Sequence, residues 1–130
     1  MPELPEVETV CRGLNKALKN KVLRKVILNC QSLRHPFPKD FCVRLEHQTI
    51  IAIGRRAKYI LVSFSDHTVL IWHLGMSGRV NIFWPNDHQI QPQEQLHDHV
   101  TFETTDNIVV RFNDPRRFGS MDLAHLSSLC

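Results

Sequence analysis

Two residues at the head of the chain have the chemistry of a covalent catalyst. Pro2 follows the initiator methionine directly, and Glu3 follows Pro2. A small second residue normally lets the methionine be removed, which leaves proline with a secondary amine. That amine titrates near pH ~8, so far more of it is neutral at pH 7 than of a lysine amine. It can attack carbonyl-like carbon and form an iminium, and the Glu3 carboxyl can exchange a proton beside it.

The same stretch also fits the start of a helix, and the residues alone leave both interpretations open. Pro5 suits the first helical position, and a carboxylate such as Glu6 opposes the helix dipole in the first turn. Apolar residues at helical spacing predict an amphipathic helix over residues ~5–19; they are Val7, Val10, Cys11, Leu14 and Leu18. Pro2 and Glu3 precede that helix and are not explained by it.

A second candidate is Lys58, in the stretch GRRAKYILV. Gly54 permits a close backbone approach, and two arginines follow it. Lys58 is then expected to open a strand and to point away from Tyr59. A lysine there suits a contact to a phosphate backbone. It equally suits a sheet edge, where lysine blocks aggregation.

Two further stretches predict exposed turns that carry large side chains. In HLGMSG, which begins at His73, glycines bracket Met76, and a methionine held in such a turn can wedge into a partner. A flexible hairpin with an incidental methionine is the alternative. In NDPRRFG, Arg116 can make two hydrogen bonds to a base edge, and Phe118 can stack or wedge beside it.

The stretch QLHDHV places His97 and His99 two residues apart, on one face of an expected strand. Two histidines make an incomplete metal site, because no convergent third ligand is evident in the sequence. A histidine that contacts phosphate is the favoured interpretation, and an ordinary strand histidine is its rival. No metal site is therefore predicted.

Most of the remaining chain has the alternation and turn punctuation of short strands. Eight strands are expected, over residues 22–30, 48–55, 58–65, 68–74, 78–84, 98–105, 107–114 and 118–124. Hairpin turns are expected at 65–67 and 105–107. A second short helix is expected at 38–46, and a surface loop at 85–98. Short connections favour a mainly β (α+β) fold, an antiparallel two-sheet β-sandwich with the N-terminal helix against it.

Length and composition set the broad class. The chain has 130 residues, 42% of them hydrophobic, which is enough for one domain with its own core. No apolar run approaches the ~18 residues of a membrane span, and no secretory signal pattern opens the chain, so an intracellular protein without a membrane partner is expected. The four cysteines include no C-x-x-C pair, which disfavours a zinc site. The net charge of +3 is weak evidence for a nucleic-acid partner, and basic residues beside turns are better evidence.

Five motifs in register give the chain a family resemblance. PELPEVE, RRAKY, HLGMSG, HDHV and DPRRFG, in this order and spacing, resemble the N-terminal domain of formamidopyrimidine-DNA glycosylase, in the family that it shares with endonuclease VIII. The resemblance covers essentially the whole of residues 1–130. Met76, Arg116 and Phe118, together with PELPEVE, point to the formamidopyrimidine branch.

The resemblance implies base-excision repair of damaged double-stranded DNA. Oxidised purines such as 8-oxoguanine and formamidopyrimidines would be removed, and the abasic strand would then be cleaved. Pro2 would attack C1′, and the iminium would permit β,δ-elimination. Glu3 would donate a proton to the sugar ring oxygen. Lys58 would contact the phosphate next to the lesion and assist the chemistry.

The resemblance also implies a DNA-binding set. His73 and His97 would hold backbone phosphates. Met76, Arg116 and Phe118 would fill the gap left by the flipped nucleotide, and Arg116 would pair with the orphaned cytosine. Chemistry at C1′ needs an extruded nucleotide, so inserted side chains must offset the cost of unstacking.

The resemblance finally implies what residues 1–130 lack. Family members continue into a helix-two-turns-helix domain and a four-cysteine zinc finger, so no cofactor is expected here, and weak DNA binding and low activity are expected. A monomer in the bacterial cytoplasm, associated with the nucleoid by function, is expected. The alternative is a catalytically silent module that binds damaged DNA or a protein. A remoter alternative uses Pro2 as the general base of a tautomerase-like enzyme, but the Arg, His and Phe residues on exposed turns argue against an enclosed site.

Overall fold

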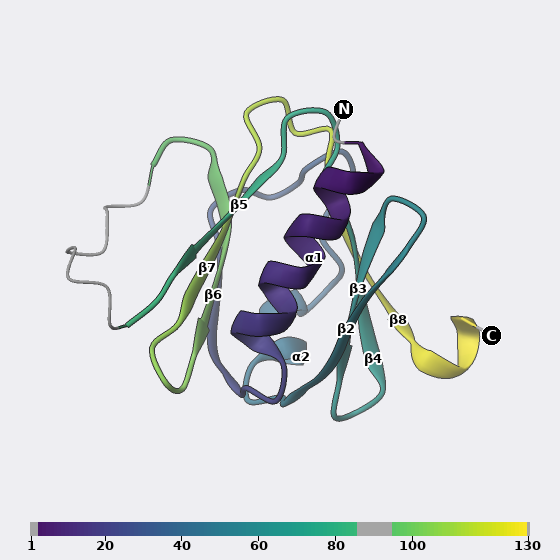
Figure 1. The fold of residues 1–130 in the computed structure, drawn as a ribbon, viewed down its shortest axis with the longest axis vertical. Coiled ribbons are helices and arrows are strands. Elements are labelled where there is room, and N and C mark those ends of the chain that lie inside the picture. Colours follow the sequence, from purple (N-terminus) through teal and green to yellow (C-terminus); the bar gives the residue numbers. More distant parts are fainter. Residues whose placement is uncertain (1–2, 86–94, 130) are drawn as a thin grey trace.

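The computed structural model describes residues 3–85 and 95–129. Eight strands in this part of the chain form two antiparallel four-stranded sheets, in the orders β1-β6-β7-β5 and β2-β3-β4-β8. Helix α1 (Leu4–Leu18) lies along the side of the two sheets (Figure 1). The predicted two-sheet sandwich with an N-terminal helix is confirmed.

All eight expected strands are present, with ends that differ from the prediction by a few residues. In chain order the elements after α1 are β1 (Leu23–Leu28), α2 (Phe41–Leu45), β2 (Ile50–Arg56), β3 (Tyr59–Phe64), β4 (Thr68–His73), β5 (Arg79–Phe83), β6 (Asp98–Thr104), β7 (Val109–Asn113), β8 (Ser120–His125) and the 3₁₀ turn η1 (Leu126–Leu129). The hairpin turns expected at 65–67 and 105–107 join β3 to β4 and β6 to β7.

Helix α1 begins one residue earlier than predicted. Leu4 is its first residue, so Pro5 occupies the second helical position, where a missing N–H also costs nothing. The predicted apolar stripe faces the core, and Asn20 follows the helix with a φ of 67° that ends it. Glu3 lies in extended backbone before the helix, and its side chain makes no capping hydrogen bond. The Glu3 carboxyl is therefore not occupied in starting the helix.

One hydrophobic core joins both sheets. Trp72 of β4 is fully buried, and its ring centroid lies 5.3 Å from that of Phe112 in β7 and 5.9 Å from that of Phe102 in β6. Leu14 of α1 belongs to the same cluster. The core therefore fixes the helix relative to both sheets.

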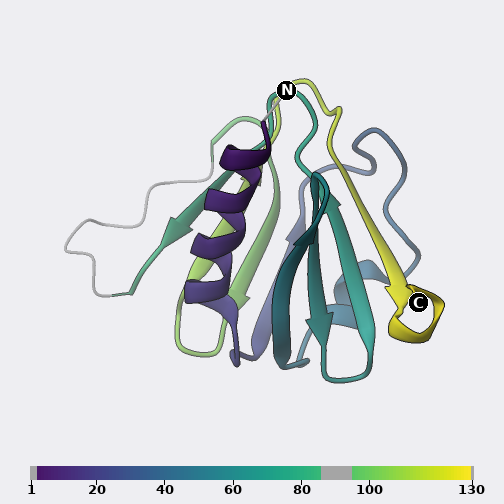
Figure 2. The ribbon, with the colours of Figure 1, turned by 45° about the vertical axis from the view of Figure 1, so that its right-hand side comes forward.

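The topology gathers several connections at one end of the molecule. Strand β3 pairs antiparallel with β2 and β4, and β8 pairs antiparallel with β4, so β2 and β4 run toward the end from which β3 and β8 leave. The β2–β3 turn, the β4–β5 loop and the β7–β8 loop therefore lie there, with the first turn of α1 (Figures 1 and 2). We call this the loop end. Apart from Pro2, which lies outside the described residues, the motifs singled out in the sequence come together at it.

Two local expectations were wrong. Lys58 lies in the two-residue turn between β2 and β3 and does not open β3, which begins at Tyr59. His97 has a φ of 75° and precedes β6, which begins at Asp98, so it is not a strand residue; its ring still lies beside that of His99, with centroids 6.0 Å apart. Within the described residues, neither helix has the length and apolarity that crossing a bilayer requires.

Candidate nucleic-acid interface

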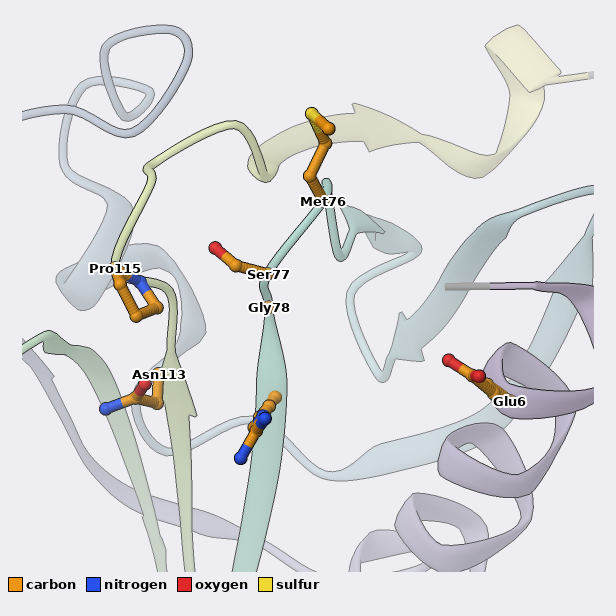
Figure 3. Close-up of a pocket in the computed structure, with 7 residues that line it drawn as sticks. Glu6, Met76, Ser77, Gly78, Asn113 and Pro115 are labelled. Atoms are coloured by element: carbon orange, nitrogen blue, oxygen red, sulfur yellow. The ribbon is translucent and has the colours of Figure 1, made fainter. Parts of the chain in front are cut away.

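The first turn of α1 and the β4–β5 loop share one groove at the loop end. The groove has a volume of about 670 Å³, and its lining is Glu6, Met76, Ser77, Gly78, Arg79, Asn113 and Pro115. Figure 3 shows Glu6 projecting from α1 toward the loop that carries Met76 and Ser77, with Asn113 and Pro115 on another wall. The helix start and the two loops that the sequence singled out are thus neighbours in space.

A second groove lies on the other side of Met76. It has a volume of about 610 Å³ and is lined by Leu33, Arg34, His73, Gly75, Met76, Arg117 and Phe118. Met76 lines both grooves and is 48% exposed, so it forms a ridge between them. A methionine in that position fills no core, as the Gly/Ser turn predicted.

The buried carboxylate of Asp114 holds the two loops together. Its Oδ1 accepts a hydrogen bond from the Ser77 hydroxyl at 2.9 Å, and its Oδ2 accepts one from the backbone N–H of Gly119 at 2.9 Å. The Ser77 hydroxyl oxygen in turn accepts the backbone N–H of Arg116 at 3.2 Å. Because Asp114 is fully buried, these bonds are shielded from water. The turn of Met76 and the turn of Phe118 are therefore held as one unit.

His73 lines the second groove, and a hydrogen bond defines the tautomer of its neutral ring. Its Nδ1 accepts the backbone N–H of Gly75 at 3.0 Å, so in the neutral ring the proton sits on Nε2. Burial lowers the pKa of His73, and the positive charges of Arg34 and Lys58 lower the pKa further. The ring packs against that of Tyr59 at a tilt of 59°, with centroids 5.0 Å apart. His73 is therefore a neutral N–H donor near pH 7.

Lys58 belongs to the same electrostatic neighbourhood. Its turn follows β2, and the next residue, Tyr59, lies opposite His73 in the β3–β4 register. The positive charge of Lys58 is among the causes that lower the pKa of His73, after burial and the charge of Arg34. A cation and an N–H donor held close together suit the recognition of a phosphate oxygen.

Arg116 and Phe118 extend from the β7–β8 loop into solvent. Phe118 is 44% exposed, and the Arg116 guanidinium carbon lies 5.6 Å from the centre of its ring. Arg117 between them has a φ of 56°. The loop thus offers a cation and an aromatic ring on a backbone that Asp114 holds in place.

The comparison with known protein families decides the assignment of the chain. The family model described as the formamidopyrimidine-DNA glycosylase N-terminal domain matches residues 1–121. The chain belongs to this family.

Individual relatives agree with the family assignment. A formamidopyrimidine-DNA glycosylase of Rhodopseudomonas palustris (strain TIE-1) is 44% identical over 128 residues, which cover 93% of this chain and 44% of that protein. A namesake from Ruegeria pomeroyi is 46% identical over 129 residues, covering 95% of this chain and 44% of that protein. The chain thus spans less than half the length of the curated relatives it matches.

Solved structures share the fold at 29% identity. The Lactococcus lactis formamidopyrimidine-DNA glycosylase, bound non-covalently to DNA containing an AP site, superposes with a TM-score of 0.84 over 98% of this chain and 47% of that chain. A structure of MutM in complex with DNA containing carbocyclic 8-oxo-G gives a TM-score of 0.83 over 98% of this chain and 46% of that chain.

Most of the predicted site residues converge in the fold. Glu3, Lys58, His73, Met76, Arg116 and Phe118 all lie at the loop end. Pro2 lies outside the described residues. His97 is at the same end, where its carbonyl oxygen accepts the backbone N–H of Asp114 at 3.1 Å, so its backbone has a structural role.

The predicted lack of a metal site remains a prediction. Among the described residues, no three His, Cys, Asp or Glu side chains lie close enough together to hold a metal ion. His99, which pairs with His97 in the sequence motif, is buried, and its Nε2 lies 2.9 Å from the carbonyl oxygen of Asp114. His99 is therefore a structural histidine that supports the β7–β8 loop.

Four residues that contribute to the candidate site are not evident as such from the sequence. The motif DPRRFG predicts Asp114 only as a turn former, although its carboxylate holds both loops. The helix pattern explains Glu6 only through the dipole. Leu33 and Arg34 lie in a segment without periodicity, and the backbone N–H of Arg34 donates to the carbonyl oxygen of Gly119 at 3.0 Å. The DPRRFG motif was the available signal for Asp114, while nothing local marked the segment of Arg34.

Proposed function

We propose that the chain is the catalytic N-terminal domain of a bifunctional formamidopyrimidine-DNA glycosylase and AP lyase that acts in base-excision repair. Its partner is damaged double-stranded DNA, and its substrates are oxidised purines such as 8-oxoguanine and formamidopyrimidines. The observation that carries the proposal is the shared groove, where the first turn of α1 meets the ridge of Met76. Family membership and the DNA-bound structures of similar proteins support it.

The first step belongs to the amine of Pro2 after removal of the initiator methionine. The nitrogen lone pair forms a bond to C1′ of the damaged nucleotide, and the bond from C1′ to the base breaks. The proton lost from the Pro2 nitrogen neutralises the departing base anion. Glu3 donates a proton to the sugar ring oxygen, which opens the ring and leaves an iminium. The exposed Glu3 side chain, not engaged in a helix cap, supports this role.

The second step breaks the strand. The iminium makes the C2′ protons acidic, so loss of one of them expels the 3′ phosphate by β-elimination. A further elimination then expels the 5′ phosphate. Lys58 and His73 are proposed to hold phosphates beside the reacting sugar, and the ordered Nε2–H of His73 supports that role. His97 is proposed as a further phosphate contact.

The exposed side chains of the loop end are proposed to stabilise the flipped state. Met76 and Phe118 enter the space that the everted nucleotide leaves, and Arg116 pairs with the orphaned cytosine. The bonds of Asp114 support this proposal, because they hold the two turns in a fixed relation before DNA binds. No cofactor is proposed for residues 1–130, and the protein is proposed to act as a monomer in the bacterial cytoplasm.

Borohydride trapping tests the proposal. Protein whose mass confirms loss of Met1 is incubated with duplex containing 8-oxoguanine or an abasic site and is then reduced. A covalent adduct is expected, and Pro2→Gly is expected to weaken it sharply. Protein that retains Met1 is the matched control, because its Pro2 nitrogen is an amide and carries no nucleophilic lone pair.

A silent binding module is the second candidate function. The specific observation in its favour is that the chain spans less than half the length of its relatives, so the matched region is not shown to carry their whole activity. Salt-sensitive binding of the abasic duplex without any adduct, from protein that has lost Met1, would identify this function and exclude the glycosylase activity.

A further inference from the structure

The proposed reaction needs two groups that come from different elements. The start of the chain leads into α1, whereas Lys58 sits in the β2–β3 turn. Their alignment depends on how the helix is joined to that turn. Arg55 of β2 makes this connection directly.

A single guanidinium spans the gap. Nε of Arg55 donates to Oε2 of Glu8 on α1 at 2.6 Å. Nη1 of the same side chain donates to the carbonyl oxygen of Ala57 at 2.8 Å. That carbonyl belongs to the peptide bond between Ala57 and Lys58. Arg55 therefore links the helix to the peptide group of Lys58 through two hydrogen bonds.

The turn that Arg55 holds is short and conformationally costly. Arg56 pairs with Tyr59 across the hairpin, so Ala57 and Lys58 alone form the connection. Ala57 has a φ of 52°, in the left-handed region that a residue with a Cβ adopts at a cost. A hydrogen bond to its carbonyl oxygen favours this conformation over the alternatives. Any change in the conformation of the turn would move Lys58, because the turn contains only Ala57 and Lys58.

The interaction is better suited to alignment than to stability. The side chains of Arg55 and Glu8 are 31% and 37% exposed, and solvent-exposed ion pairs of this kind contribute little to folding. The hydrogen bond from Arg55 holds the pKa of Glu8 below its usual value, with the Arg12 charge as a smaller cause, so the carboxylate stays ionised near pH 7. Cys11, the other titratable group beside this pair, has a pKa raised by burial and is a neutral thiol.

We propose that Arg55 is a positioning residue that aligns Lys58 with the catalytic start of the chain through Glu8. The effect on catalysis rests on the proposed function, whereas the link between Glu8 and the Lys58 turn rests on the hydrogen bonds of Arg55. An arginine is required because its planar fork reaches two acceptors at once, which a lysine ammonium on a flexible stem does not reproduce.

The first test does not depend on activity. The backbone amide of Lys58 is followed by ¹⁵N NMR as the pH is lowered through the titration of Glu8. In the wild type we expect this amide to report that titration, although Glu8 lies on another element. Glu8→Gln removes the response, as does Arg55→Lys. Arg12→Gln is the matched control, because Arg12 also contacts Glu8, at 3.4 Å, yet has no link to the turn, so the response persists.

The second test measures the consequence. Single-turnover trapping on abasic duplex is expected to slow by about 10- to 100-fold in Arg55→Gln and Arg55→Lys, with unchanged affinity for DNA and unchanged thermal stability. Arg12→Gln keeps the wild-type rate. A wild-type rate in a folded Arg55→Gln variant overturns the inference, and so does a Lys58 amide that ignores Glu8. If the wild type forms no adduct, the proposed function is wrong. The NMR titration then still shows whether Glu8 is linked to the Lys58 turn.

Discussion

His73 is the residue at which protonation and DNA binding are expected to couple. In the free protein, burial and the neighbouring cations lower the pKa of His73, so the ring is neutral near pH 7. A phosphate at Nε2 favours the imidazolium form, because an anion stabilises the adjacent charge. DNA binding should therefore raise the pKa of His73 and take up a proton.

His73 is expected to make DNA affinity and folding stability depend on pH in opposite directions. Affinity for abasic duplex is expected to rise as the pH falls from about 8 to about 6, and His73→Gln should flatten that dependence. The stability of the free protein should instead fall as the pH falls. Folding lowers the pKa of His73, so the contribution of His73 to the free energy of unfolding is complete above the ordinary pKa of ~6.5 and is lost on acidification. Fluorescence anisotropy measures the pH dependence of DNA affinity, and thermal unfolding measures the pH dependence of stability.

His67→Gln is the control for that experiment, since His67 is exposed in the β3–β4 turn at the opposite end of the molecule. Its DNA affinity should follow the wild-type pH dependence. An identical dependence in the wild type and in His73→Gln would remove His73 from the phosphate-binding set.

At the scale of elements, the loop end depends on a tight contact between two loops. Gly75 has a φ of 73°, and a Cβ built on it would collide with the backbone N of Gly119 and with the backbone of Phe118. Any side chain here must therefore push the β4–β5 loop away from the β7–β8 loop. The Met76 ridge and the Phe118 side chain would separate as a result.

Gly75→Ala is expected to lower both stability and DNA affinity. The left-handed backbone costs about 1–2 kcal/mol for alanine, and overpacking against backbone typically adds about 1–3 kcal/mol. Denaturant unfolding measures the change in the free energy of unfolding. Gly54→Ala in β2 is the control, because an added Cβ there meets nothing within 4 Å. Equal stability of the two variants would show that the loops are not in rigid contact.

The same scale explains what the sequence could and could not predict. Alternation and turn residues are local signals, so they located all eight strands and the helix. The expectation that His97 lies in the same strand as His99 was wrong, because His97 adopts a φ of 75° just before β6 begins, and no local pattern marked that backbone conformation. The roles of Asp114 and Arg34 are set by partners far away in the chain, and no local pattern contains that information.

At the scale of the whole molecule, one core serves both sheets and the helix. Phe112 is fully buried and touches Trp72 across the sandwich. Phe112→Ala is expected to cost about 3–5 kcal/mol. Because the core is shared, the unfolding midpoints from far-UV circular dichroism and from Trp72 fluorescence should coincide, both in the parent protein and in Phe112→Ala. Both proteins carry Trp84→Phe, so that Trp72 alone reports the fluorescence. Separate midpoints would mean that the two sheets unfold independently.

Charge is distributed unequally between the two ends. Away from the loop end, Lys21 pairs with Asp106 and Arg24 pairs with Glu103, which neutralises part of the basic stretch near α1. Among the described residues, Lys58 and Arg116 have no carboxylate within ion-pair distance. Lys58 and Arg116 are therefore available to a phosphate at the loop end, whereas Lys21 and Arg24 are already paired.

This asymmetry predicts how binding responds to salt. Removing one side chain that binds a phosphate should reduce the slope of log K against log salt by about 0.9, because one fewer counterion is released from the duplex. Lys58→Gln is expected to reduce the slope by that amount, and Lys21→Gln, a change at the opposite end, should leave it unaltered. Anisotropy titrations of abasic duplex over a salt series measure both. An equal reduction in the two variants would mean that DNA is held by the overall charge of the molecule and not by the loop end.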